Sequence, residues 1–200
     1  MHINVCLVGH SLIRRFRNDV QRQSNVVFQQ NLGIEEIDVQ YISKSGWCVE
    51  HILANASRIV TEKPQIIILQ CGTNDLCSAT DPIPVAAKLL DAAVKVKKMA
   101  GAKWIFVCQI LHRKKGRYSP AALDEYNARV DQANSWLKGN CEQRTGVKFW
   151  KHRGMKEPVV QEFGPVVGKD GVHLAPRGQY KLYKSLRGAV LFGLNHSPSV

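Results

Sequence analysis

The chain has 200 residues, a hydrophobic content of 44% and a formal net charge of +12. A chain of this length can bury its apolar side chains in one core, so we expect residues 1–200 to form a single domain. We find no apolar run long enough to cross a bilayer and no apolar leader behind a charged segment, which argues against a membrane-spanning or secreted protein. The positive charge favours anionic partners.

The cysteines predict a reducing environment. Of the six in the chain, Cys6, Cys71 and Cys108 lie inside or at the ends of apolar runs, where a free thiol packs as a small hydrophobe. We find no Cys-x-x-Cys pair of the kind that holds zinc. We therefore expect free thiols and an intracellular, cytoplasmic location. We also expect no cofactor.

Apolar, strand-like segments alternate with amphipathic, helix-like segments along the chain. In chain order, the predicted elements are strand 3–8, helix 12–22, strand 37–42, helix 49–61, strand 65–70, helix 83–99, strand 104–110, helix 121–144, strand 147–150 and helix 176–192. Residues 67–69 and 105–107 are continuously apolar, as in strands that helices cover on both faces. The order predicts an α/β fold with five parallel strands and right-handed crossovers.

Turn residues follow the first three predicted strands and carry polar groups. Ser11 follows the first strand, Gly46 the second and Asn74 the third, so a parallel sheet would gather them at one edge. Ser11 would also begin a helix, where free amides favour negative charge. The amides of Ser11 and Gly46 and the side chain of Asn74 could together form an oxyanion hole.

A serine needs a base to become a nucleophile, and His173 is the candidate. Asp170 lies three residues earlier and could orient the imidazole and stabilise its charged form. The four residues Asp170-Gly171-Val172-His173 are short enough to form one local turn. Taken together with the turns after the strands, they predict a hydrolytic active site.

Each of these residues also has a structural explanation. Ser11 could simply cap its helix, and Gly46 and Gly72 could be ordinary turn glycines. Asn74 could bond its own backbone, and His173 could precede a helix that begins near Pro176. It is the joint pattern of four segments that favours the functional interpretation.

Four sequence blocks resemble those of the SGNH hydrolases, which are also called GDSL-type esterases and lipases. The blocks are Gly9-His10-Ser11-Leu12, Gly46, Gly72-Thr73-Asn74-Asp75 and Asp170-Gly171-Val172-His173. The resemblance spans nearly the whole chain and implies a flavodoxin-like three-layer α/β/α sandwich and metal-free hydrolysis of an acyl ester. It implies that Ser11 is the nucleophile, that Ser11, Gly46 and Asn74 form the oxyanion hole, and that Asp170 and His173 complete the triad.

The chain departs from the family pattern at one position. His10 stands where the family has an aspartate before the nucleophile. This change leaves the triad intact, but it alters the local hydrogen bonds and could change pH dependence or substrate choice. We do not expect His10 to be a catalytic base.

Two other functions remain open from the sequence. One is a metal-dependent phosphoesterase with Asp75, Asp170, His10 and His173 as ligands, although their spacing matches no phosphoesterase motif known to us. The other is a catalytically weak or inactive module that binds nucleic acid or anionic membrane through basic clusters. These clusters are residues 14–17, 95–98 and 113–117. They could equally be a solvated surface.

Overall fold

A computed structural model describes residues 2–22, 28–114, 120–155 and 165–198. Its five strands form one parallel sheet in the order β2-β1-β3-β4-β5. They are β1 (Ile3–Gly9), β2 (Ile37–Ser43), β3 (Ile66–Gln70), β4 (Trp104–Cys108) and β5 (Val147–Trp150). The five predicted strands are confirmed, and β3 and β4 are entirely buried, as expected for central strands.

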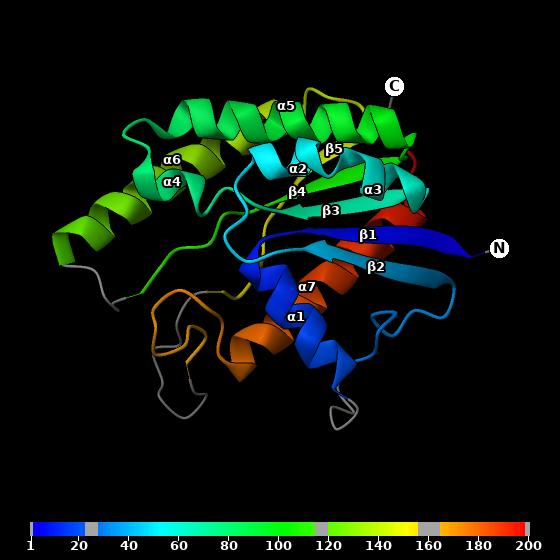
Figure 1. The fold of residues 1–200 in the computed structure, drawn as a ribbon, viewed down its shortest axis with the longest axis horizontal. Helices are drawn as coiled ribbons and strands as arrows, with labels where there is room; N and C mark the ends of the chain where they lie inside the picture. Colours follow the sequence, from blue (N-terminus) through cyan, green and yellow to red (C-terminus); the bar gives the residue numbers. More distant parts are fainter. Residues whose placement is uncertain (1, 23–27, 115–119, 156–164, 199–200) are drawn as a thin grey trace.

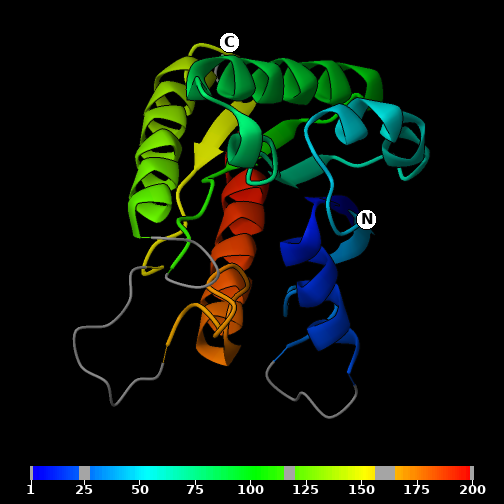
Figure 2. The same ribbon diagram turned by 60° about the vertical axis from the view of Figure 1, so that its left-hand side comes forward.

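Helices cover the sheet on both faces (Figure 1). They are α1 (Ser11–Gln21), α2 (Glu50–Ala54), α3 (Ala56–Thr61), α4 (Asp75–Ser78), α5 (Pro82–Ala100), α6 (Pro120–Cys141) and α7 (Pro176–Asn195). One face packs against α1 and α7 and the other against α2, α3, α5 and α6, which gives two apolar cores. The helices α1 and α7 lie side by side (Figure 2), with the rings of Phe16 and Tyr183 in contact.

Local chemistry fixes the ends of the long helices. Asp81 caps α5 by accepting a hydrogen bond from the amide of Ile83 at 2.9 Å, and Gly101 ends the helix with a left-handed φ of 64°. Pro176 occupies the first turn of α7, where its missing amide hydrogen costs nothing.

The predicted helix 49–61 is the main difference between prediction and structure, because it is divided into α2 and α3. Asn55 leaves helical geometry at the division, with φ −109° and ψ 15°. Its side chain donates to the carbonyl oxygen of His51 at 2.8 Å and so competes with the backbone. The short helix α4 was not predicted, because four residues are too few for an apolar period.

All six cysteines are free thiols, as predicted. Within the ranges that the structure describes, no helix is both long enough and apolar enough to cross a membrane.

The segment before α7 folds as a tight turn that leans on the helix. Val167 and Leu174 form an antiparallel bridge, and the amide of Ala175 donates to the carbonyl oxygen of Val166 at 2.9 Å. Gly178 of α7 lies against that same carbonyl, and a Cβ atom at this position would collide with it. The segment that carries Asp170 and His173 is therefore held by a close helix contact.

We expect Gly178→Ala to destabilise the protein by roughly 1–3 kcal/mol, because the new methyl group meets a fixed backbone oxygen. Gly139→Ala is the matched control on α6, where an added Cβ meets nothing within 4 Å. This control should stabilise by about 0.5–1 kcal/mol through helix propensity. Urea unfolding measures both changes, and equal stability of the two variants would contradict the contact.

Candidate active site

The carboxyl edge of the sheet brings three of the predicted site residues together. Ser11 is the first residue of α1, Gly46 lies in the loop after β2 and Asn74 lies in the turn after β3. A small cavity of about 10 Å³ is lined by Ser11 and Asn74. The Gly46 loop joins them through a hydrogen bond in which Asn74 Nδ2 donates to the carbonyl oxygen of Trp47 at 2.9 Å.

Asp170, His173 and Ser11 form a chain of hydrogen bonds. His173 Nε2 lies 3.1 Å from Ser11 Oγ, and His173 Nδ1 lies 2.7 Å from Asp170 Oδ2. The carboxylate can only accept, so Nδ1 carries the proton and donates it. Nε2 of the neutral ring is then the acceptor for the Ser11 hydroxyl, which is the tautomer that a general base requires.

Asp170 is held in its ionised form. Partial burial opposes ionisation, but hydrogen bonds from the His173 amide, the His173 ring and the Val172 amide outweigh it and hold the pKa of Asp170 well below its usual range. The two amides donate to Oδ1 at 2.9 and 3.0 Å, which leaves Oδ2 for the imidazole. The carboxylate is therefore both charged and fixed in direction.

Neighbouring side chains fix the Gly46 loop from two sides. Asp75 accepts the amide hydrogen of Val49 with both carboxylate oxygens, at 3.0 and 3.2 Å, while Asn74 holds the carbonyl of Trp47. Burial raises the pKa of Asp75, and the bond from Val49 partly opposes this shift. Gly46 itself has a left-handed φ of 81°, a conformation that favours glycine.

The three hydrogen-bond donors of the predicted oxyanion hole remain available. The amides of Ser11 and Gly46 donate to no acceptor in the described part of the chain. Asn74 Nδ2 has two hydrogens and uses one of them on Trp47. The three donors predicted from the sequence are therefore free to form hydrogen bonds with a negatively charged oxygen.

His10 is the N-cap residue of α1. It is buried, and its Nδ1 accepts from the amide of Leu12 at 3.3 Å. Burial, with smaller contributions from nearby His173 and Arg113, lowers the pKa of His10 to about 4. The ring is therefore neutral, and its Nε2 has no hydrogen-bond partner among the described residues.

The segment after β4 is held by two asparagines that sequence analysis did not single out. Asn134 of α6 bonds both the amide and the carbonyl of Ile110, each at 2.9 Å. Asn127 does the same for Arg113, at 2.9 and 3.0 Å. The seven-residue spacing of the two asparagines on one helix was the signal available in the sequence.

A second polar network closes the carboxyl ends of β3, β4 and β5. His152 Nε2 donates to Gln70 Oε1 at 2.7 Å, and its Nδ1 accepts from Ser185 Oγ at 2.7 Å. Gln70 Nε2 donates to the carbonyl of Gln109 at 3.1 Å. Burial lowers the pKa of His152 to about 4, so the ring is neutral. Both ring nitrogens of His152 are therefore used in structural hydrogen bonds.

The metal-ligand set considered from the sequence does not gather at one point. Among residues 2–22, 28–114, 120–155 and 165–198, no three His, Cys, Asp or Glu side chains could share a metal ion. Asp75 and His173 each have other partners, the Val49 amide for Asp75 and Asp170 for His173.

Residues 7–181 match the model of the GDSL-like lipase/acylhydrolase family, and the chain belongs to this family. The family supports hydrolase or esterase activity in general terms. No curated protein sequence matches the chain significantly.

Solved structures with the same fold extend over almost the whole chain. A candidate acylhydrolase from Bacteroides fragilis is 15% identical with a TM-score of 0.74, and the match covers 96% of this chain and 88% of that one. A GDSL-like lipase from Bacteroides thetaiotaomicron is 14% identical with a TM-score of 0.66, covering 94% and 88%. A lipolytic G-D-S-L family member from Veillonella parvula is 17% identical with a TM-score of 0.63, covering 95% and 98%.

We expect the two buried histidines to make folding sensitive to acid. Each has a pKa of about 4 when folded against 6.5 unfolded, so only the unfolded state binds protons between these values. The free energy of unfolding is therefore highest above pH 6.5 and falls as the pH drops toward 4. Between pH 7.5 and pH 5 each histidine should lower it by about 2 kcal/mol.

The matched variant is His10→Asn, which keeps a capping oxygen but removes one titrating group. Its free energy of unfolding in urea should fall by about 2 kcal/mol less than that of the wild type over the same pH interval. An identical decline in both proteins would show that His10 does not titrate as inferred.

Proposed function

We propose that the protein is a serine esterase that hydrolyses small or accessible acyl esters, such as an acetyl group on a sugar or a lipid. The observation that carries the proposal is the relay in which Ser11 Oγ lies 3.1 Å from His173 Nε2, with Asp170 at 2.7 Å behind the ring. A lone helix cap would not require an imidazole from the other end of the chain to meet the hydroxyl.

The proton path follows from this relay. Ser11 Oγ attacks the ester carbonyl carbon while its proton passes to His173 Nε2, and Asp170 stabilises the imidazolium that results. The same proton then goes to the alkoxide leaving group as the carbon–oxygen bond breaks, which leaves an acyl group on Ser11. Water repeats the sequence with His173 as base, releases the acid and restores the hydroxyl.

The negative charge that develops on the carbonyl oxygen is assigned to the free donors. The amides of Ser11 and Gly46 and the remaining hydrogen of Asn74 Nδ2 donate to no other group in the described residues, and the three residues follow β1, β2 and β3 at the same edge of the sheet. Because Asp75 and Asn74 fix the Gly46 loop in advance, little reorganisation is needed when the charge appears.

The cavity directly beside Ser11 has room for a small group only. The cavity beside Ser11 has a volume of about 10 Å³, which is close to the space of one water molecule. It is bounded by Leu111, Thr73 and Arg113 as well as by Ser11 and Asn74. A longer acyl chain would have to extend into the neighbouring cavity of about 880 Å³, which shares Leu111 and Arg113 with this one.

We expect Ser11→Ala to reduce kcat for p-nitrophenyl acetate by about a thousandfold or more, because the nucleophile is removed. A fluorophosphonate should label the wild type on the peptide that contains Ser11, and chelators should leave hydrolysis unchanged. Ser135→Ala, an exposed serine on α6, is the control and should keep full activity. Full activity in Ser11→Ala would exclude the proposal.

We expect Asn74→Ala to lower kcat by about a hundredfold to a thousandfold, with a smaller effect on KM, because one oxyanion donor is lost. Asp75→Asn is the matched variant in the same turn: it keeps an acceptor for the Val49 amide and should change activity little. Steady-state kinetics on p-nitrophenyl acetate measures both. Equal losses in the two variants would assign the effect to loop distortion rather than to charge stabilisation.

A further inference from the structure

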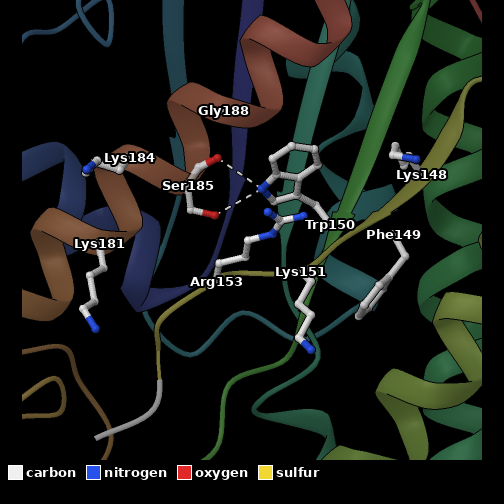
Figure 3. Close-up of a pocket in the computed structure, with 9 residues that line it drawn as sticks. All are labelled: Lys148, Phe149, Trp150, Lys151, Arg153, Lys181, Lys184, Ser185 and Gly188. Atoms are coloured by element: carbon white, nitrogen blue, oxygen red, sulfur yellow. Dashed lines mark hydrogen bonds between the residues drawn. The ribbon is translucent and has the colours of Figure 1, made fainter. Parts of the chain in front are cut away.

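A groove with cationic walls lies between the edge strand β5 and helix α7, separate from the Ser11 cavity (Figure 3). Its volume is about 630 Å³. Five of its lining residues are cationic: Lys148, Lys151, Arg153, Lys181 and Lys184. Figure 3 shows Lys181 and Lys184 on the helix side and Lys148 and Lys151 on the strand side, so positive groups flank the groove on both sides.

The charge of this groove is not balanced locally. Residues 144–155 and 176–195 carry four Lys or Arg side chains each and no carboxylate, against a net charge of +12 for the whole chain. None of the five cationic side chains forms an ion pair with a carboxylate in the described part of the molecule. Like charges brought together without counter-charges repel one another, so this surface favours an anionic ligand.

The floor of the groove is apolar and firmly built. Trp150 Nε1 donates to both the carbonyl oxygen and Oγ of Ser185 at 3.1 Å, which ties the indole to α7. The helix passes close to the indole at Gly188, where an added Cβ would lie 3.4 Å from the Trp150 ring, in van der Waals contact. The ammonium group of Lys148 lies over the Phe192 ring, with Nζ 4.8 Å from the ring centre. Charged groups on both sides of an aromatic floor can accommodate phosphates together with bases or sugars.

A neighbouring cavity links the groove to the pocket beside Ser11. A second cavity of about 880 Å³ shares Lys151 and Arg153 with the groove. This cavity also shares Arg113 with the pocket beside Ser11. No described residue that lines any of the three hollows is acidic. The surface is therefore longer than one phosphate or carboxylate group requires.

We propose that the groove between β5 and α7 binds single-stranded nucleic acid, with the lysines and Arg153 on phosphates and the Trp150 floor against bases or sugars. A duplex keeps its bases inside and would leave the floor unused. A flat anionic membrane fits a concave surface poorly. Of the three large apolar side chains exposed among the described residues, Leu53 and Met99 lie on α2 and α5, across the sheet. The ring of the third, Tyr180, lies beneath Lys184 Nζ at 5.6 Å.

The test uses the full chain and a fluorescein-labelled oligo(dT) of about 20 nucleotides, followed by fluorescence anisotropy. The groove variant is Lys151→Gln/Arg153→Gln/Lys184→Gln, in which all three positions are exposed. We expect its affinity at about 0.1 M salt to fall at least about tenfold, and the slope of log affinity against log salt to become shallower by about 2. These changes correspond to the loss of three phosphate contacts.

The control variant is Arg58→Gln/Lys63→Gln/Lys98→Gln, which removes the same charge from exposed positions on or near α3 and α5. It should bind almost as tightly as the wild type. Equal losses in both variants would assign binding to net charge and overturn the groove, and so would absence of binding by the wild type.

Two further measurements separate the remaining possibilities. Ser11→Ala should bind the oligonucleotide as the wild type does, whether or not the chain proves to be an esterase. Sedimentation with phosphatidylserine vesicles tests the lipid alternative: binding of vesicles but not of oligo(dT), with loss in the groove variant, would overturn the nucleic-acid assignment in favour of a membrane.

Discussion

The candidate site depends on one hydrogen bond, between His173 Nε2 and Ser11 Oγ, which joins side chains 162 residues apart. Ser11 is placed by the sheet, because β1 leads directly into α1. His173 lies in a turn outside the strands and helices, so other bonds must position it. Its carbonyl accepts from Gly168 at 2.7 Å, and the Gly171 carbonyl accepts from Lys114 at 2.8 Å. The geometry of the Asp170–His173–Ser11 relay therefore depends on the backbone hydrogen bonds that hold this turn.

Beyond the ends of the strands, amide and carboxylate side chains form the hydrogen bonds that hold the loop backbone. Asn74 and Asp75 bond the Gly46 loop, and Asn127 and Asn134 bond the segment after β4. Buried amides are costly when unpaired, so each loop conformation that satisfies them is favoured over its alternatives. These two segments can in this way hold donors and acceptors as firmly as a helix or strand would.

Much of this arrangement could be predicted from the sequence, because it follows from periodicity and topology. Continuous apolar runs identify β3 and β4, and parallel order places Ser11 and Asn74 at one edge. The groove could not be predicted in the same way. Lys181 and Lys184 share a helix face by their spacing, but only the packing of α7 against β5 brings them opposite Lys148. Inspection of the sequence instead favours runs of adjacent basic residues, and part of one such run, 115–117, lies outside the described residues.

The histidine at position 10, where the family pattern has an aspartate, affects the charge of the pocket beside Ser11. A capping aspartate would place a negative charge in the pocket that also holds Arg113 and Ser11. His10 makes the same capping bond as a neutral ring, since burial lowers its pKa to about 4. The potential beside Ser11 is then more positive than an aspartate would allow. Loss of a carboxylate here favours both a developing oxyanion and an approaching polyanion, so a single change in the family pattern is consistent with both proposed functions.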